Sequence, residues 1–502
     1  MKSLLFVKYL PKTLLLKLNI QYMVDIFTYL IYFYASALTF LYLTLMVLSY
    51  YNTLRYRYRY SKKDEDYLQK FPDEAPGISI VAPAYNEEVI IVDSVHSLLN
   101  LDYPNFEVVI VNDGSKDETL ALLMAHFELE EVPYYYVYKV NCKVVKRILR
   151  SKNPTYSKLI VVDKVNGQTK ADAMNAGVNV AKYEYFINTD VDCILAKDTL
   201  TKIILPVLDS EEQVIAVGAT MRMVNSCTIA NGRITRVRPP NALIPLFQET
   251  EYLRSYLVGK MGWSMLNAIP NVSGGFGLFD TSVVINTGGF DSGSHAEDMD
   301  MTVRMVAYMR ENAKPYRIVQ CPYTCCWTEG PPNLKVLNRQ RTRWGRGLLQ
   351  FMIDHRRLLF NKDYGRLGFL VMPYILIFEF LAPIIEFIGL ILIFFLLFTN
   401  QINFDTFWMM LLYAYLIGFA VSVITVSYDL ILDKLYKKFP EYLKLVLFSA
   451  FEAILYHPLV VIFTLRGYIQ YLTRRDFKWG KMTRKGFSQT TQANTVSHVE
   501  KI

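Results

Sequence analysis

The sequence predicts a mixed α/β domain, with a mostly parallel sheet, that lies between membrane-crossing helices. Two observations support this fold class. First, the 502-residue chain is 52% hydrophobic, more than a soluble enzyme usually contains, and its apolar residues are concentrated in four long stretches. Second, the roughly three hundred residues between the first and second stretch alternate short β-branched runs with helical patterns, as α/β domains do.

The four apolar stretches each exceed the roughly 20 residues that are needed to cross a bilayer. They cover residues 22–51, 367–398, 404–432 and 443–472. The last stretch contains Glu452, His457, Pro458 and Arg466. Polar residues and proline inside a span are costly, so a broken, re-entrant or interfacial hairpin is favoured there. A simple fourth span with an external tail is the alternative.

Basic side chains predict the orientation of the chain. They cluster after the first stretch, from Arg55 to Lys63, and before the second, from Arg356 to Arg366. Because such residues flank spans on the cytoplasmic side, we expect an integral protein of the cell membrane whose central domain is cytoplasmic. Most of the net charge of +8 then faces membrane lipid, and no nucleic-acid partner is expected. Lys8 and Lys17 conflict with a single N-terminal crossing.

These observations divide the chain into four regions. They are an N-terminal arm with a transmembrane helix (1–60), a cytosolic domain (70–350), interfacial and transmembrane helices (351–472) and a basic cytosolic tail (473–502). All six cysteines fall in the cytosolic domain, where reduced thiols are expected. Cys321, Cys325 and Cys326 could suggest a metal, but no second cluster has zinc spacing, so ordinary buried cysteines are favoured.

Five β-branched runs in the central domain are predicted to be buried strands. They cover residues 78–82, 108–111, 159–162, 185–187 and 214–218, with helices at 88–100 and 116–127 between them. Ligands of such sheets collect at the carboxyl ends of the strands. The polar residues that follow the runs are therefore the candidates for a binding site.

Two turns and an acidic pair follow these strands. The first strand runs into Ala84, Asn86 and Glu87, and the second into Asp113. A lone Asp-Gly after a strand is usually only a turn. The fourth run is followed by Asp190 and Asp192, whose alternate side chains can face one edge and offer oxygen ligands to Mg²⁺ or Mn²⁺. An Asp-x-Asp pair alone is common on loops.

A Gln-Arg-Thr-Arg-Trp segment precedes the second apolar stretch. Gln340, Arg343 and Trp344 combine a hydrogen-bonding group, a permanent cation and a flat apolar face, which suits a site that holds a diphosphate beside a sugar ring. An Arg and Trp pair at a membrane edge is also a common interfacial anchor.

Six motifs occur along the chain in a fixed order. They are the Asn86-Glu87 turn, the Asp113 turn, the run from Lys170 to Gly177, the pair Asp190 and Asp192, Glu297-Asp298 and the segment from Gln340 to Trp344. In this order, and with flanking apolar stretches, the chain resembles the membrane-embedded family 2 glycosyltransferases, which include synthases of cellulose, hyaluronan and poly-N-acetylglucosamine. The resemblance covers residues 75 to 350 closely and the membrane part in arrangement only.

The resemblance implies a GT-A fold, with a Rossmann-like mixed and mostly parallel sheet, that uses a nucleotide-activated sugar. The donor is usually UDP-linked, and the reaction inverts the anomeric carbon. By position, Asp113 matches the carboxylate that contacts the base or ribose, and Ala84, Asn86 and Glu87 match the other wall of that pocket. Lys170 and Asp172 match an element near the diphosphate and donor sugar.

The same resemblance assigns the reacting groups. Asp190 and Asp192 match the metal-binding pair, with Asp192 as the direct ligand. Asp298, beside Glu297, matches the general base, and Gln340, Arg343 and Trp344 match the acceptor-end and diphosphate site. A further set of residues, Ser273, Gly274 and Gly275, matches a loop that contacts the acceptor sugar.

The residue types suit this chemistry independently of the resemblance. A carboxylate such as Asp298 can accept the proton of a sugar hydroxyl as it attacks. A cation at Asp192 and the guanidinium of Arg343 can stabilise the leaving nucleoside diphosphate. Glu297-Asp298 could equally be an acidic helix start, and the glycines of the 273–275 loop could form a plain tight turn.

One segment departs from the family pattern, and another carries no motif with a known function. Family members tend to have Asn-Gly-Gly-Lys where this chain has the longer Asn166-Gly167-Gln168-Thr169-Lys170, which leaves the donor side uncertain. The basic, Tyr-rich insertion at 134–158 has no motif that indicates a function.

We expect a nucleotide-sugar donor and a growing polysaccharide acceptor, with export through the membrane helices as a further hypothesis. The alternative is a single-transfer enzyme that uses a lipid-linked acceptor. A non-catalytic membrane scaffold or a transporter is disfavoured by the intact acidic motifs. The sugar, the linkage and any export partner do not follow from the sequence.

Overall fold

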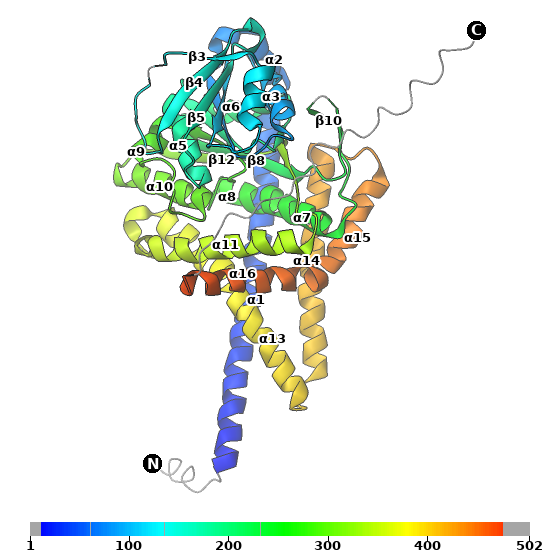
Figure 1. The fold of residues 1–502 in the computed structure, drawn as a ribbon. Helices are drawn as coiled ribbons and strands as arrows, with labels where there is room; N and C mark the ends of the chain where they lie inside the picture. Colours follow the sequence, from blue (N-terminus) through cyan, green and yellow to red (C-terminus); the bar gives the residue numbers. More distant parts are fainter. Residues whose placement is uncertain (1–11, 61, 135, 231, 475–502) are drawn as a thin grey trace, which may run out of the picture.

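The computed structural model describes residues 12–60, 62–134, 136–230 and 232–474 (Figure 1). The start of the predicted N-terminal arm, with Lys8, lies outside these residues, and so does the predicted basic tail except for Thr473 and Arg474. The described chain forms an α/β domain at one end and a group of long helices at the other.

A ten-stranded mixed sheet forms the centre of the α/β domain, in the order β3-β4-β5-β2-β1-β6-β11-β8-β12-β7. The four central strands β5 (Leu159–Lys164), β2 (Phe106–Asn112), β1 (Ile78–Ala84) and β6 (Tyr185–Thr189) pair in parallel. All but one of their residues are buried, as expected for strands covered on both faces. This confirms the predicted fold class and four of the predicted strands.

Beyond β6 the sheet continues with β8, which the sequence predicts in part, and with three strands that it does not predict. Strand β11 (Phe276–Asp280) is antiparallel to both β6 and β8 (Gln213–Met223), and β12 (Tyr316–Thr328) is parallel to β8. The short strand β7 (Ile194–Leu195) closes this edge against β12. The predicted run at 214–218 is therefore the first half of a longer strand, β8.

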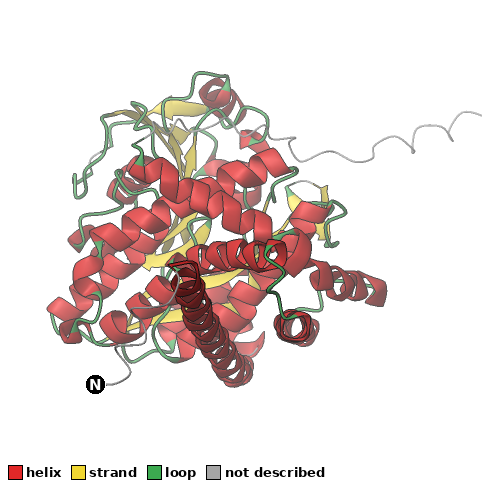
Figure 2. Cartoon of the chain, turned by 90° about the horizontal axis from the view of Figure 1, so that it is seen from below, coloured by secondary structure: helices red, strands yellow, loops and turns green. Residues whose placement is uncertain are grey.

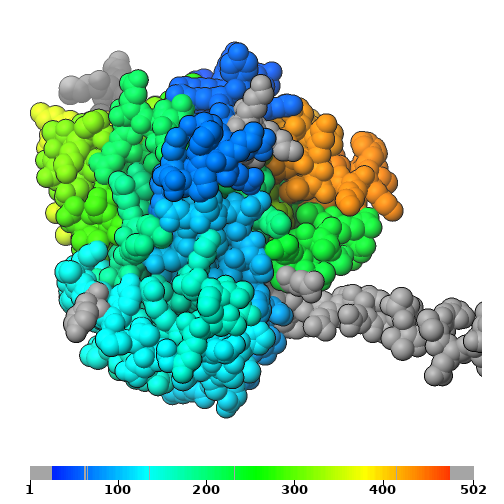
Figure 3. All heavy atoms as spheres, turned by 90° about the horizontal axis from the view of Figure 1, so that it is seen from above, coloured from blue at the N-terminus to red at the C-terminus, as the bar shows by residue number. Residues whose placement is uncertain are grey.

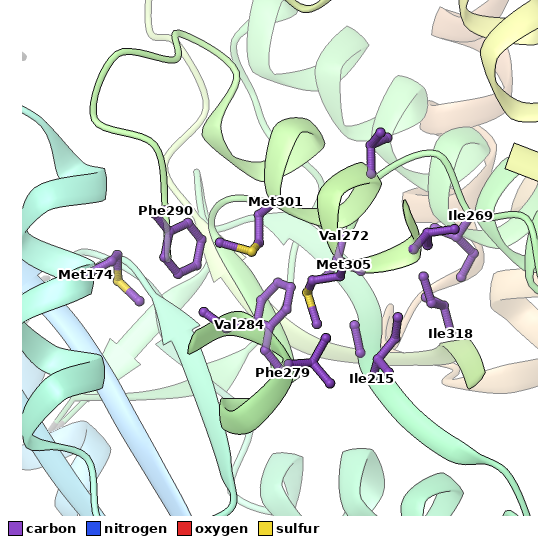
Figure 4. Packing of buried hydrophobic residues seen from close by; sticks show 14 of the residues in the cluster. Met174, Ile215, Ile269, Val272, Phe279, Val284, Phe290, Met301, Met305 and Ile318 are labelled. Carbon is purple, nitrogen blue, oxygen red and sulfur yellow. The ribbon is translucent and has the colours of Figure 1, made fainter. Parts of the chain in front are cut away.

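Helices pack on both faces of the sheet. They include α3 (Ile91–Leu99), α4 (Thr119–His126), α5 (Lys170–Val180), α6 (Thr199–Leu208), α9 (Thr281–Asn286) and α10 (Glu297–Glu311). Figure 4 shows one part of the core, where four side chains lie close together. They are Met174 of α5, Phe279 of β11, Phe290 of the loop before α10, and Met301 of α10. The core thus joins the first half of the domain to the helix that carries Glu297 and Asp298.

The insertion at 134–158 has a structural role. It forms strand β4 (Val145–Ser151), which is antiparallel to β5, with β3 (Leu129–Glu131) beyond it. Before β4, the chain follows the polar face of α5, where Asn179 accepts hydrogen bonds from the backbone of Lys139 and Val140. Figure 3, which shows the molecule from above, places the cyan to turquoise part of the chain, to which the insertion belongs, together on one part of this face.

Three helical segments are long and apolar enough to cross a membrane. They cover Asp25–Arg59 of α1 (Lys12–Arg59), Leu367–Phe398 with α13 (Ala382–Phe398) at its end, and α14 (Phe404–Leu432). All three extend away from the α/β domain, and the described start of α1 lies at the same end as the α13–α14 connection (Figures 1 and 2). They coincide with the first three predicted stretches.

The fourth apolar stretch is broken. Helix α15 (Phe439–Leu455) and helix α16 (His457–Leu472) meet at Tyr456 with a bend of 48°, and together they could form a broken span or a re-entrant loop. Helix α16 lies alongside α11 (Leu334–Asp354) and across the direction of α1 (Figure 1). The predicted hairpin agrees with this geometry, and Pro458 stands in the first turn of α16, where proline is tolerated.

Buried ion pairs join the two parts of the molecule. Arg222, at the end of β8, contacts Asp429 of α14 at 2.6 Å, and both side chains are almost completely buried. Arg254 donates to Glu452 of α15 at 2.5 and 3.1 Å. A buried charge is stable only when it is paired, so each contact fixes a membrane-side helix against the α/β domain.

Candidate active site

The turns after β1 and β2 form a common wall at the carboxyl edge of the sheet. The backbone N–H of Asn86 donates to Ser115 Oγ at 3.0 Å, and the side chain of Asn86 accepts from the N–H of Lys116 at 2.8 Å. The N–H of Glu87 donates to Thr119 Oγ1 at 2.8 Å. Asn86 has φ of 57°, a left-handed conformation that asparagine tolerates better than most residues. These bonds hold Ala84, Asn86 and Glu87 beside Asp113.

Asp113 is buried beside this wall. Its Oδ1 accepts a hydrogen bond from Lys164 Nζ at 2.5 Å and another from the N–H of Gly167 at 2.9 Å. Lys164 also contacts Asp172 Oδ2 at 2.5 Å. Asp172 therefore lies beside Lys164 and Asp113, and its predicted role near the diphosphate and donor sugar stays a prediction.

The loop from Asn166 to Lys170 has the conformation that its unusual sequence requires. Gln168 has φ of 64°, in the left-handed region that glycine would occupy without strain. Thr169 then caps helix α5, because its hydroxyl accepts from the N–H of Asp172. The longer loop is thus accommodated by strain at one residue and a regular helix start at the next.

Lys170, the first residue of α5, points to a second group of residues. Its Nζ contacts Asp190 Oδ1 at 2.5 Å and donates to the carbonyl of Gly274 at 2.5 Å. Although burial disfavours its charge, the carboxylates of Asp190 and Glu297 raise the pKa of Lys170 above its ordinary value. The side chain of Asn188 donates to the same Gly274 carbonyl at 3.0 Å. Strand β6, helix α5 and the glycine loop therefore meet at Gly274.

Asp190, Asp192 and Cys193 could hold a metal ion. Each offers one ligand atom, and these atoms lie within 4.8 Å of one another. The Asp190 side chain is 40% exposed, so an ion there would stay accessible to a ligand. Two carboxylates with open coordination positions fit a small divalent cation such as Mg²⁺ or Mn²⁺.

Asp298 contacts the same glycine loop through Gly274. Its Oδ2 accepts from the N–H of Gly274 at 3.0 Å, and its Oδ1 accepts from the N–H of Met299 at 2.9 Å. A Cβ at Gly274 would lie 3.4 Å from the Asp298 side chain, an ordinary van der Waals contact, so the loop and this carboxylate are direct neighbours. Burial, together with the neighbouring charge of Asp298, raises the pKa of Glu297.

The loop before β11 is fixed from below. Ser273 Oγ accepts from the N–H of Gly275 at 3.4 Å, and Tyr256 makes a side-chain hydrogen bond to Ser273. Tyr256 belongs to a π-helical turn (Arg254–Lys260), an irregularity that is frequent at functional sites. The three predicted loop residues are partly exposed, and they lie beside both Asp190 and Asp298.

The Gln-Arg-Thr-Arg-Trp segment lies on helix α11. Gln340 accepts from Gln248 at 3.2 Å. Arg343 is close enough to Glu297 for its positive charge to oppose the raised pKa of that carboxyl. Trp344 is 37% exposed. The face of its ring is covered by the guanidinium of Arg341, 4.3 Å from the ring centroid.

Sequence reasoning missed three residues of this site. Lys164 is fully buried between Asp113 and Asp172, and Asn188 holds the Gly274 carbonyl. Arg341 forms a two-pronged ion pair with Glu251 and donates to Tyr456 Oη at 2.8 Å. The sequence contained one signal for Lys164: it stands at the end of a strand that begins with the apolar run Leu-Ile-Val-Val, where a buried lysine needs acidic partners.

The predicted residues therefore form two neighbouring groups. Asp113 and Asp172 gather around Lys164, with the Asn86-Glu87 turn bonded to the turn that follows Asp113. Lys170, Asp190, Gly274 and Asp298 form the second group, with Asp192 next to Asp190 and with Glu297 and Arg343 within electrostatic reach. Acidic residues at the carboxyl edge of a mostly parallel sheet define a GT-A-like α/β domain.

Sequence comparisons assign the family. Residues 79–255 match the model described as glycosyl transferase family 2, and residues 246–421 match the one described as glycosyl transferase family group 2. Together the two matches run from β1 into α14. These residues therefore form a domain of the glycosyl transferase family 2 type.

Relatives of known name share part of this chain. It is 28% identical, over 300 residues, to the poly-beta-1,6-N-acetyl-D-glucosamine synthase of Staphylococcus aureus (strain COL), a match of 59% of this chain and 60% of that protein. It is 26% identical over 274 residues to the protein of the same name from Staphylococcus epidermidis, with 55% of each chain covered. The chain thus spans about 60% of the length of these relatives.

Among solved structures, the chain is similar to the mannosyltransferase PcManGT from Pyrobaculum calidifontis in complex with GDP-Man and Mn2+. The TM-score is 0.47 at 16% sequence identity, with 88% of this chain and all of that chain covered.

Proposed function

We propose that the protein is an inverting membrane glycosyltransferase that moves a sugar from a UDP-linked nucleotide sugar to a growing polysaccharide. The observation that carries the proposal is the meeting of Lys170, Asp190 and Asp298 around the single residue Gly274. A cation, a metal-ligand carboxylate and a second carboxylate then surround one small space, as sugar transfer from a diphosphate requires.

In this proposal the two carboxylate groups have different tasks. Asp298 accepts the proton of the acceptor hydroxyl as that oxygen attacks the anomeric carbon, and the bond to the diphosphate breaks on the opposite face. Lys170 and Arg343 stabilise the negative charge that develops on the leaving nucleoside diphosphate. A divalent cation held by Asp190 and Asp192 would supply further positive charge to that diphosphate.

The remaining predicted residues take part in binding. Asp113, with Ala84, Asn86 and Glu87, binds the nucleoside, and Asp172 supports that pocket. Ser273, Gly274, Gly275 and Trp344 contact the terminal sugar of the acceptor, and Gln340 lies beside them. In this proposal the α/β domain is cytoplasmic, so that α1, α13 and α14 cross the membrane and α16 lies near its surface.

The names of the staphylococcal relatives suggest the first donor to test. They are poly-beta-1,6-N-acetyl-D-glucosamine synthases, so UDP-N-acetylglucosamine is the reasonable starting donor, followed by UDP-glucose as a comparison. Purified protein in lipid nanodiscs is incubated with labelled donor and Mg²⁺ or Mn²⁺, and UDP release and product size are measured. A ladder of lengthening products is expected, and a single added sugar on lipid would contradict the polymer assignment.

Trp344 tests the acceptor end of the proposal. Trp344 is 37% exposed, so its ring is available for a sugar to stack on; Trp344→Ala is therefore expected to shorten the products, while Trp344→Phe keeps much of their length. Gel separation of labelled products measures this. Full-length polymer made at the normal rate by Trp344→Ala would rule out the stacking role.

A further inference from the structure

One buried lysine stands at the centre of the nucleoside side of the site. Lys164 is the last residue of β5, and none of its side chain is exposed. Its Nζ contacts Asp113 Oδ1 at 2.5 Å, Asp172 Oδ2 at 2.5 Å and the carbonyl of Val165 at 2.7 Å. The contacts with Asp113 and Val165 are hydrogen bonds, and the contact with Asp172 is an ion pair, so the buried ammonium faces three oxygens.

The position of Lys164 follows from the sheet. In the parallel pair of β2 and β5, Asn112 is opposite Asp163, so the next residues of the two strands, Asp113 and Lys164, are neighbours beyond the last register pair. The four residues Leu159, Ile160, Val161 and Val162 precede this end of β5 and are all buried. A buried ammonium is costly in such surroundings unless it is fully paired.

The contacts on Asp113 leave one of its oxygens for a ligand. Lys164 Nζ and the N–H of Gly167 both bind Oδ1. Among the described residues, no hydrogen bond falls on Oδ2, so this oxygen is the acceptor that a bound nucleoside can use. Because Oδ1 is held at two points, the direction of Oδ2 is fixed as well.

Lys164 also links this pocket to helix α5. Asp172, in the first turn of α5, receives Lys164 on Oδ2 and the N–H of Lys143 on Oδ1 at 2.8 Å. A Cβ on Gly167 would come within 2.0 Å of Asp172 Oδ2, so the carboxylate packs directly on the glycine that bonds Asp113. The same helix begins with Lys170, which contacts Asp190.

We propose that Lys164 is a positioning residue for nucleoside recognition, because it sets the acceptor Oδ2 of Asp113 and ties it to the helix that carries Lys170. The proposal deepens the proposed function and rests on it. Lys164 does not touch the reacting atoms. Its effect should therefore appear in the binding of the nucleoside and much less in the binding of a bare diphosphate.

The test compares UDP with inorganic pyrophosphate at one fixed Mg²⁺ concentration. Calorimetry gives both dissociation constants, and their ratio measures what the nucleoside contributes to binding. The full-length protein in nanodiscs is used as wild type, Lys164→Met, Asp172→Asn and the double variant of both. The double variant removes one positive and one negative charge, so it keeps the net charge of the cluster and is expected to fold where Lys164→Met alone does not.

Asp172→Asn keeps the bond between Lys164 and Asp113 but weakens the link from Lys164 to α5, so its ratio should lie between those of wild type and the double variant. In the double variant the ratio should fall about tenfold, the size of one charge-assisted hydrogen bond, while pyrophosphate binding changes little. Lys158→Met is the matched control on the residue just before β5, where Lys158 Nζ lies 3.8 Å from the Phe106 ring centroid and donates to the carbonyl of Pro104. It should keep the wild-type ratio.

The outcomes separate the two proposals. If wild type prefers UDP and the folded double variant keeps that preference, Lys164 has a purely structural role and the inference is wrong. If both affinities fall equally in the double variant, the pocket has been damaged as a whole, which also contradicts it. If wild-type protein binds neither UDP nor pyrophosphate, the proposed function is wrong, and the inference that rests on it is wrong as well.

Discussion

Replacing Asp298 by asparagine tests the proposed base while it leaves the fold intact. Asp298 accepts one hydrogen bond from the N–H of Met299 and one from the N–H of Gly274. The carboxamide oxygen of asparagine can keep one of these bonds, since it has the same shape. What is lost is the capacity to accept a proton, which contributes about 10² to 10⁴ in rate, or roughly 3 to 5 kcal/mol of the barrier.

Two measurements distinguish a chemical defect from a binding defect. UDP release with labelled donor should show that kcat of Asp298→Asn falls by at least about a hundredfold. The dissociation constant of UDP should stay within about twofold of wild type, because the pocket at Asp113 does not touch Asp298. A fall in kcat with unchanged UDP affinity is the expected pattern.

Asp300→Asn is the matched control, two residues along the same helix. Asp300 accepts from His355 Nε2 at 2.8 Å and forms an ion pair with Arg304 at 2.7 Å, away from the Gly274 loop. Its loss should lower thermal stability and leave the chemical step within a few-fold of wild type. Wild-type turnover in Asp298→Asn would refute the base assignment, and so would an equal loss in Asp300→Asn at full folding.

Three further predictions concern stability and metal binding. Arg341→Met leaves Glu251 without its cation and should cost about 3 kcal/mol of unfolding free energy in a denaturant titration, the low end for a broken buried pair because 26% of the Glu251 side chain is exposed. Burial raises the pKa of Asp300, but its contacts with His355 and Arg304 outweigh that effect and lower the pKa below its ordinary value. The difference in unfolding free energy between wild type and Asp300→Asn should therefore be constant near pH 7 and shrink as the pH falls below about 4. Asp192→Asn should abolish the rise in melting temperature that Mn²⁺ gives to wild type, whereas Glu212→Gln, on an exposed loop, should keep it.

The parallel half of the sheet could be predicted because its strands are buried on both faces and read as short apolar runs rich in β-branched residues. The runs at 78–82 and 159–162 are examples, and the register of their strands brings Asn86 and Asp113 to one edge. The order of the acidic motifs along the chain then placed the candidate residues at that edge. Local pattern and topology agreed here, so the inference was sound.

The second half could not be predicted in the same way. Strand β11 contains Gly277, and strand β12 has Pro322 among its residues, so neither reads as a regular strand. Both are held by long-range pairing with β8, whose register with β12 shifts between Arg317 and Ile318 and again near Thr324. Such pairing depends on tertiary contacts that no window of sequence contains.

Long-range contacts also explain why individual roles were missed. Lys164 and Arg341 look like surface charges in the sequence, yet their partners Asp172 and Glu251 are 8 and 90 positions away along the chain. Lys170 and Asp172 were assigned to one element near the diphosphate and donor sugar because they match a single family motif. On a helix, residues two apart point in different directions, so Asp172 turns to Lys164 while Lys170 turns to Asp190.

The buried ion pairs suggest why catalysis and the membrane helices are built as one unit. Arg341 lies in the segment that carries Gln340, Arg343 and Trp344, and it is bonded to Glu251 and to Tyr456 at the junction of α15 and α16. If α16 moved by even part of a turn, Arg341 would lose its partner Tyr456, and Trp344, which lies against the Arg341 guanidinium, would lose its support. The position of the proposed acceptor-stacking ring is therefore set by a membrane-side helix. An enzyme that releases its acceptor into solution would have no need of such a connection.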